Sequence, residues 1–312
     1  MLLGNLWTYF YNRVKHRVLG RRMPFLDRVL LSNRSAFSFV FLFIAAGLLV
    51  PGAVAQGPPP IRFANISTRL AVGTDSNVLI AGFIITGSQP KKVLIRGLGP
   101  SLPVLSQLAD PVLELHDSSS TLAATDNWRD TQQDELKATT IPPRNDYESG
   151  LVKTLSPGAY TVILSGKGRT TGVGLVELYD LDGTVDSKLS NIATRGFVDK
   201  GDSVLIGGTI ILGTGTTDVL FRAIGPSLIP FGVNNALQDT TLELFNGQGV
   251  KVATNDDWQD SQKAEIEATT IPPSDPREAA ILRSLSPGNY TAIVRGKNNT
   301  TGVGSIEAYQ IK

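Results

Sequence analysis

Short runs of branched apolar residues, bounded by glycine, proline, serine and aspartate, follow one another along the chain from residue 61 onward. Residues 77–86 are apolar at both odd and even positions, which is typical of an inner strand covered on both faces. Residues 112–117 alternate between apolar and polar, which is typical of a strand with one face in water. A helical pattern is limited to residues 131–138, where Asp130 is the expected N-cap. The pattern therefore predicts an all-β fold.

The succession of strands and turns occurs twice. The segment at residues 65–68 returns at residues 191–194, and Trp128 returns as Trp258. Insertions between the copies fall between the predicted strands, as expected when strands are packed and loops are not. Each copy has the usual size of one domain. We therefore expect two tandem β-sandwich domains, jelly-roll-like in character, each with its own core. Their predicted boundaries are residues 61–184 and 185–312.

The N-terminal section has the layout of an export signal. Basic residues precede an apolar run at residues 36–50, and the small residues of an Ala-Val-Ala cleavage site follow it directly. That run is shorter than the roughly 20 residues that a membrane-spanning helix needs. We expect residues 1–55 to be removed and residues 56–60 to form a proline-rich linker, with translation starting at Met1 or Met23. The mature chain is then expected to have no membrane span and to be extracellular, periplasmic or on the cell surface.

Composition and charge exclude several classes of function. The sequence contains no cysteine, so thiol catalysis, disulfides and thiolate metal sites are excluded. Residues 1–55 hold seven of the 29 basic residues and one of the 28 acidic residues, so the remainder is mildly acidic. An acidic surface repels a phosphate backbone, and nucleic acid is not an expected partner. His116 has Phe245 as its counterpart, which argues against a histidine-based triad or metal site.

The second half of each copy has a characteristic order of segments. In the second copy a strand at residues 241–246 leads into an acidic loop, a Ser-Pro-Gly turn at residues 286–288 and a closing segment at residues 300–309. This succession resembles the bacterial pre-peptidase C-terminal domain, a secreted β-sandwich module. The resemblance implies an accessory, non-catalytic domain, here without an attached peptidase. The leading part of each copy resembles tandem repeats of exported bacterial proteins.

Oxygen-bearing side chains recur in one loop of each copy. Carboxylate and amide oxygens suit Ca²⁺, which takes six to eight oxygen ligands. The spacing is not that of an EF-hand, and the same residues can close an Asx turn or cap a helix, so a purely structural loop stays open as the alternative. The predicted calcium ligands are Asp126, Asn127 and Asp130 in the first copy and Asp256, Asp257 and Asp260 in the second.

The same loops contain one indole each. Trp128 beside Arg129, and Trp258 beside Gln259, offer the flat apolar surface with polar edges that binds sugars. A tryptophan repeated in two β-sandwiches also commonly fills the core beneath a loop, and this alternative stays open. Two weak sites on tandem domains would bind a polysaccharide with avidity.

Charged residues within the strands complete the candidates. Arg96 and Arg222 are expected to form cross-strand ion pairs with Glu114 and Glu243 on the wet face. Glu177 and Glu307 are the other strand carboxylates repeated in both copies, but nothing in their spacing supports an acid and base pair. No catalytic residue is predicted.

Three hypotheses follow from the sequence. The leading one is an exported, non-enzymatic surface or extracellular interaction module whose partner is a polysaccharide or a cell-surface protein. The alternative is a purely structural module of the envelope or matrix with calcium-stabilised loops. A hydrolase that uses strand carboxylates ranks last.

Overall fold

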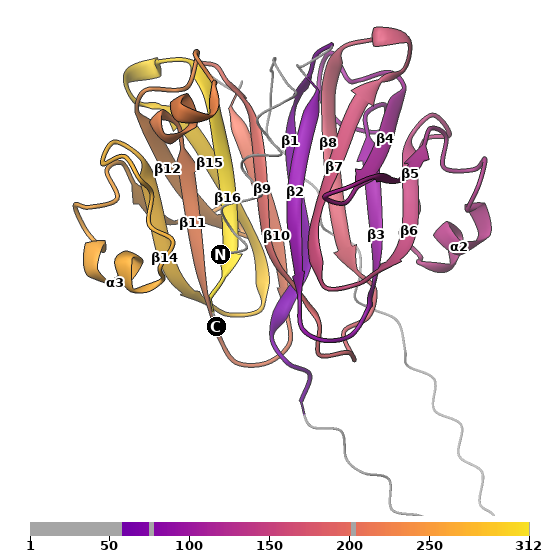
Figure 1. Ribbon diagram of the computed structural model, residues 1–312, viewed down its shortest axis with the longest axis horizontal. Helices are drawn as coiled ribbons and strands as arrows, with labels where there is room; N and C mark the ends of the chain where they lie inside the picture. The colour runs from indigo at the N-terminus through magenta and orange to yellow at the C-terminus, as the bar shows by residue number, and fades with distance from the viewer. Residues whose placement is uncertain (1–57, 75–77, 201–203, 312) are drawn as a thin grey trace, which may run out of the picture.

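Nearly all of the chain that can be described is β-structure. The computed structural model describes residues 58–74, 78–200 and 204–311. These residues form two eight-stranded antiparallel sheets (Figure 1). Branched and other apolar side chains fill the space between the sheets, where they are shielded from water. The predicted all-β sandwich architecture is confirmed.

The element bounds follow the apolar runs of the sequence. The strands of the first repeat are β1 (Arg62–Val72), β2 (Leu79–Thr86), β3 (Lys91–Leu98), β4 (Pro111–His116), β5 (Thr121–Thr125), β6 (Ser149–Leu155), β7 (Gly158–Gly166) and β8 (Gly172–Asp180). The strands of the second repeat are β9 (Lys188–Val198), β10 (Leu205–Leu212), β11 (Thr217–Ile224), β12 (Thr240–Asn246), β13 (Lys251–Asn255), β14 (Ala279–Leu285), β15 (Gly288–Gly296) and β16 (Gly302–Gln310). The helical segments are α2 (Gln133–Ala138), α3 (Lys263–Ala268) and the 3₁₀ turns η2 (Lys167–Arg169), η3 (Pro226–Phe231) and η4 (Lys297–Asn299).

Strand order shows that each repeat is a jelly roll. The first repeat contributes the order β1-β8-β3-β6 to one sheet and β2-β7-β4-β5 to the other. The second repeat contributes the equivalent strands, β9-β16-β11-β14 and β10-β15-β12-β13, each to the opposite sheet. Eight strands divided in this way between two sheets are the arrangement of a jelly roll.

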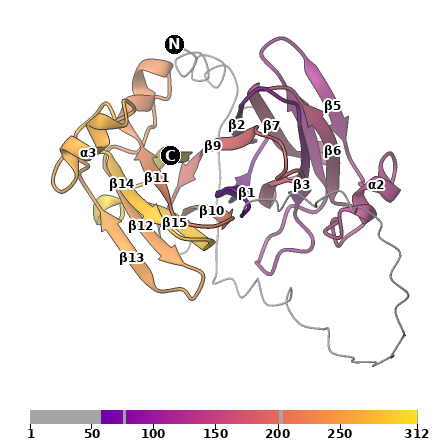
Figure 2. The same cartoon turned by 90° about the horizontal axis from the view of Figure 1, so that it is seen from below.

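The two jelly rolls are fused edge to edge. Strand β1 pairs with β10, and β2 pairs with β9, so each sheet runs through both repeats (Figure 2). One buried apolar cluster consequently contains residues of both repeats, from Phe63 to Ala308. The expectation of a separate core in each copy is wrong, because the repeats share strand pairing and buried side chains. The boundary near residue 184 stays a prediction.

Side chains close the outer edges of the sheets at β6 and β14. The Gln132 amide donates to the Val152 carbonyl and accepts from the Val152 amide, both at 3.0 Å. Gln262 does the same with Leu282, at 3.0 and 3.2 Å. A glutamine that occupies both backbone groups of an edge residue blocks the pairing of another strand there.

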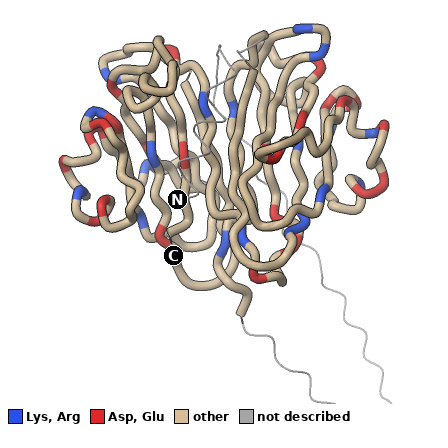
Figure 3. The backbone as a smooth tube through the Cα atoms, viewed as in Figure 1, with Lys and Arg blue, Asp and Glu red and all other residues tan. Residues whose placement is uncertain are grey.

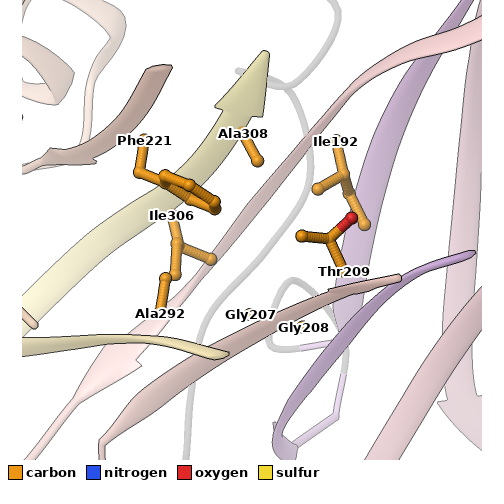
Figure 4. A pocket seen from close by; sticks show the side chains of 8 residues that line it. All are labelled: Ile192, Gly207, Gly208, Thr209, Phe221, Ala292, Ile306 and Ala308. Carbon is orange, nitrogen blue, oxygen red and sulfur yellow. The ribbon is translucent and has the colours of Figure 1, made fainter. Parts of the chain in front are cut away.

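The interior of the second repeat contains a small apolar cavity (Figure 4). Small residues explain it: Ala292 and Ala308 stand where the first repeat has Val162 and Leu178. Thr209 likewise occupies the position of Phe83, whose ring stacks on Tyr160 at 5.3 Å between centroids. The cavity is lined by Ile192, Gly207, Gly208, Thr209, Phe221, Ala292, Ile306 and Ala308.

The predicted helix is present but shorter than expected. Helix α2 begins at Gln133, and Gln132 is its N-cap, without a side-chain cap hydrogen bond. The expectation that Asp130 caps this helix is wrong, because Asp130 belongs to the preceding turn, where its amide donates to the Asn127 carbonyl at 3.0 Å.

The described linker lies against the second repeat. The amide and hydroxyl of Thr214 donate to the Pro59 carbonyl at 3.2 and 3.3 Å. Gln310 in the last strand donates to the Ile61 carbonyl at 3.3 Å, so the two described ends meet. The predicted signal at residues 1–55 lies outside the described residues. Within the described ranges, no helix is long and apolar enough to cross a membrane.

Candidate metal centre

Two loops of the second repeat converge on one acidic cluster. Asp239 directly precedes β12, whereas Asp256 and Asp257 directly follow β13, its hairpin partner. Antiparallel pairing brings the start of β12 and the end of β13 to the same end of the sheet. One oxygen of each of these three carboxylates lies within 4.8 Å of the other two. This distance range fits oxygens that share one cation.

The first repeat has the same arrangement with one substitution. Asp110 precedes β4, and Asp126 and Asn127 follow β5. An amide therefore stands where the second repeat has the Asp257 carboxylate. The first site consequently has two carboxylates and one amide.

Several oxygens in these clusters are buried and have no hydrogen-bond partner. A buried oxygen acceptor without a partner costs free energy, so its presence needs an explanation. The same atom, Oδ1, is concerned each time, and in both repeats it belongs to the cluster. These unpartnered atoms are Oδ1 of Asp110, Asp126, Asn127, Asp239 and Asp256.

A lysine from the neighbouring hairpin contacts each cluster. Lys297 in η4 places Nζ 2.7 Å from Asp256 Oδ2, 3.5 Å from Asp257 Oδ2 and 3.8 Å from Asp239 Oδ2. The hydrogen bond to Asp256 is the main cause of a raised pKa of Lys297. The ammonium group is thus the positive charge that balances the cluster.

The corresponding lysine of the first repeat is Lys167 in η2. Its Nζ lies 2.5 Å from Asp126 Oδ2 and 3.7 Å from Asp110 Oδ2. The pKa of Lys167 is raised, chiefly by the hydrogen bond to Asp126. Figure 3 shows basic and acidic positions close together at the upper corners of both lobes.

Crowding of the carboxylates also contributes to raised pKa values of Asp239 and Asp110. Burial raises the pKa of Asp239; the Lys297 ammonium lowers it, whereas the Asp256 and Asp257 carboxylates raise it further. Burial likewise raises the pKa of Asp110, with a further contribution from Asp126. A cation stronger than one ammonium would stabilise the ionised form of these groups.

The structure sorts the predicted calcium ligands into two groups. Asp126, Asn127, Asp256 and Asp257 lie in the clusters, as the sequence suggested. Asp130 and Asp260 do not belong to the described clusters: both are exposed, and Asp130 Oδ2 accepts from Asn127 Nδ2 at 3.2 Å.

Sequence reasoning missed one cluster position in each repeat. Asp110 and Asp239 lie before the hairpin, whereas the other cluster residues follow it. Both residues precede the strand that contains the repeated Leu-Glu-Leu segment, and both are aspartates. The recurrence of an aspartate directly before this strand in both repeats could have identified the position from the sequence.

The predicted sugar-binding surface is wrong as far as its indoles are concerned. Trp128 is 2% exposed and Trp258 is 4% exposed. Each indole N–H donates to a backbone carbonyl, of Asn145 and Asp275 respectively, at 3.1 Å. The rings fill a cluster on the outer face of the sheet, beneath the loop, so they cannot stack on a sugar.

Of their predicted neighbours, Arg129 covers its indole and Gln259 is exposed. The Arg129 guanidinium lies 4.4 Å from the centre of the Trp128 ring, and its Nε lies 2.5 Å from Asp146 Oδ1. A guanidinium in this position gains a cation–π interaction and occupies the face that a sugar would need. Gln259 replaces it in the second repeat.

The strand arginines pair with a partner other than the predicted one. Arg96 and Arg222 bind Glu177 and Glu307, which stand directly opposite on the neighbouring strand. Arg96 Nη1 also donates to the Ile141 carbonyl at 2.8 Å. The expected pairs with Glu114 and Glu243 are wrong, because β4 lies in the sheet opposite to β3, and β12 lies in the sheet opposite to β11.

Glu114 and Glu243, which do not pair with the arginines, have other partners. Glu114 Oε2 lies 2.8 Å from His116 Nε2. Glu243 pairs with Lys251 at 2.9 Å and with Arg295 at 3.5 Å. Both glutamates therefore belong to local surface contacts within the β4 and β12 hairpins and their neighbours.

A second repeated glutamate, missed in the sequence, ties two loops together. Glu278 is fully buried, and its Oε1 accepts from the amides of Gly225 and Ser227 at 2.9 and 2.8 Å. Glu148 holds Gly99 and Ser101 in the same way. The repeated Gly-Pro-Ser segment is thus explained by amides that point at a buried carboxylate.

Comparisons with known proteins add little to this geometry. No family model and no curated protein matches the sequence. Among solved structures, the one described as "Crystal Structure of the STIV MCP" is 14% identical, with coverage of 81% of this chain and 97% of that chain. Its TM-score is 0.21, which carries no argument about fold or function.

Proposed function

We propose that this protein is an exported, non-catalytic interaction module of two fused jelly rolls, in which each repeat binds Ca²⁺ at its acidic cluster. One observation carries the calcium part. In both repeats, aspartates at equivalent cluster positions have a buried Oδ1 atom without a hydrogen-bond partner. A cation bound at the cluster would offer these oxygens a partner.

The donor set favours calcium over other metals. All six side chains offer oxygen, and oxygen-only sites suit Ca²⁺ and Mg²⁺ but not the metals that prefer nitrogen or sulfur. Partly exposed loops tolerate the irregular geometry that Ca²⁺ accepts and Mg²⁺ does not. When bound, Ca²⁺ would link the strand ends that carry the ligands. The residues that would hold it are Asp110, Asp126 and Asn127, and Asp239, Asp256 and Asp257.

The non-catalytic part rests on how four repeated glutamates are used. Glu177 and Glu307 are paired with arginines. Glu148 and Glu278 accept hydrogen bonds from backbone amides. A hydrolase needs two carboxylates free to meet water and substrate. None of these four glutamates is free in that sense.

Export and presentation complete the proposal. The signal layout and the resemblance to the pre-peptidase C-terminal domain support a location outside the cytoplasm. The linker meets the last strand at one end of the sandwich. The acidic clusters lie at the other end, because β12 begins and β13 ends there. A partner on a surface or in the extracellular space would meet these loops first.

Calcium titration of the purified protein tests the calcium part. We expect isothermal titration calorimetry to show two bound ions, and the melting temperature to rise when calcium replaces chelator. A ligand present at about 100 times its Kd and bound only to the folded state stabilises by about 2.7 kcal/mol.

Two variants in the second repeat provide a matched comparison. Asp239→Asn should weaken one site, whereas Asp260→Asn, in the same acidic loop but outside the cluster, should leave both sites intact. Absence of heat and of any melting shift at millimolar Ca²⁺ would overturn the proposal. Equal loss in both variants would place the site elsewhere.

A further inference from the structure

The lysine in each acidic cluster contacts the carboxylates that would hold a metal ion. Lys297 Nζ lies within 3.8 Å of all three carboxylates of its cluster. Lys167 Nζ lies between the two carboxylates of the other cluster. A divalent ion bound by the same carboxylates, through their Oδ1 atoms, would come within several ångströms of the ammonium at their Oδ2 atoms. Two positive charges at that distance repel strongly, so they cannot occupy one cluster together.

The hairpin that contains each lysine holds the lysine backbone next to the acidic cluster. The Lys297 amide donates to the Asp239 carbonyl at 3.1 Å, and the Lys167 amide donates to the Asp110 carbonyl at 2.8 Å. The next turn residues, Asn298 and Gly168, have φ of 55° and 60°. This tight turn fixes the lysine backbone beside the cluster in both repeats.

The lysine side chains nevertheless have room to leave. Those of Lys297 and Lys167 are 34% and 50% exposed. A long, flexible stem allows the ammonium to move into water while the backbone stays in place. The ammonium is therefore held by charge and not by burial.

We propose that Lys167 and Lys297 are built-in competitors of Ca²⁺, each of which must leave its cluster before the ion binds. This inference rests on the proposed calcium function and adds the regulation of the same sites. Because the lysine is tethered, it competes at a constant effective concentration and lowers the apparent affinity for Ca²⁺. Loading is then expected only at the high calcium levels typical of extracellular modules.

Removal of the ammonium tests the inference directly. Lys297→Met, and Lys297→Gln should the first variant fold poorly, should raise the calcium affinity of the second site about tenfold in calorimetry, because one competing positive charge is lost. Lys167→Met should do the same for the first site. Lys263→Met is the control, since Lys263 is an exposed helical lysine that contacts only Glu267 among the ion pairs seen here.

A chemical footprint gives an independent readout in the unmodified protein. Acetylation of Lys297 and Lys167, followed by mass spectrometry, should be slow in chelator and several-fold faster in calcium, whereas Lys263 should not change. Both results together would establish displacement of the ammonium.

The outcomes separate the two proposals. If the unmodified protein binds Ca²⁺ but Lys297→Met leaves its affinity unchanged or weaker, the competition is wrong and the calcium site stands. If neither the unmodified protein nor the methionine variants bind Ca²⁺, the proposed function fails and the inference fails with it. Faster acetylation of Lys263 as well would show a general loosening and would overturn displacement.

Discussion

The two repeats agree on their outer faces and differ in their interiors. Each outer face keeps the buried tryptophan, the arginine and glutamate pair and the loop that covers them. The interior replaces Phe83 by Thr209 and Leu178 by Ala308, with a cavity as the result. Apolar core residues can change in size between the repeats, because neighbouring apolar side chains can repack around them. A buried ion pair does not tolerate the loss of one partner alone, since that loss leaves a buried charge.

The largest expected effect concerns the ion pair that both repeats keep. Arg222→Met should cost about 3–5 kcal/mol of unfolding free energy, because it leaves Glu307 buried and unpaired. Arg96→Met should cost less, since the side chain of Glu177 is 14% exposed and that of Glu307 is 0% exposed. Urea denaturation measures both values.

A double variant supplies the control for that comparison. Arg222→Met with Glu307→Leu removes both charges and should recover most of the loss. Equal costs for the two arginines would show that burial of the glutamate does not set the energy. A cost near zero would mean that the pair is not needed at all.

The next effect concerns an ion pair that only the first repeat contains. Lys91 is fully buried and donates to both oxygens of Asp180 at 3.0 Å, whereas the second repeat has Thr217 and Gln310 in contact at 3.1 Å. Lys91→Thr alone should cost about 3 kcal/mol, because Asp180 keeps only Arg62 as a cation.

Replacing both Lys91 and Asp180 by the residues of the second repeat should restore the lost stability. Lys91→Thr with Asp180→Gln reproduces the second repeat and should lie within about 1 kcal/mol of the unmodified protein in urea denaturation. A double variant as unstable as Lys91→Thr would contradict the equivalence of the two solutions.

A smaller effect should follow from an exchange of Asn127 and Asp257. Asn127→Asp adds a third carboxylate to the first cluster and should tighten its calcium binding about tenfold, which corresponds to about 1.4 kcal/mol. Asp257→Asn should weaken the second site by a similar factor. Calorimetry on both variants measures this, with Asp130→Asn as the control outside the cluster. Unchanged affinities would show that this position does not reach the ion.

The smallest effect concerns the cavity. Ala292→Val gives the second repeat the residue of the first, Val162, and should stabilise by about 1 kcal/mol by filling empty space. Val162→Ala should destabilise, because it opens the same space in a packed core. Midpoints of urea denaturation report both. A destabilising Ala292→Val would mean that the cavity is too narrow for two methyl groups.

Local patterns explain what the sequence predicted well. Alternation and the duplication predicted the strands, because each depends on residues close in the chain or on direct repetition. The acidic loop was found for the same reason, since Asp126 and Asn127 are adjacent. Asp110 was missed because only the pairing of β4 with β5 brings it to that loop.

Features that depend on pairing between distant strands were not predictable in this way. The partner of Arg96 is decided by the register of β3 against β8, which places Glu177 opposite it. The direction of Trp128 is decided by the helix and sheet that enclose it. The fusion of the repeats depends on which edges meet, and no local pattern encodes that choice.

Fusion through β1 with β10 and β2 with β9 covers one edge of both sheets in each repeat. Glutamines shield the outer edges at β6 and β14, but the inner edges are shielded by the sister repeat itself. A protease that removed one repeat would leave two long, bare edges ready to pair with any exposed strand. Each repeat therefore protects the inner sheet edges of the other from pairing with other strands.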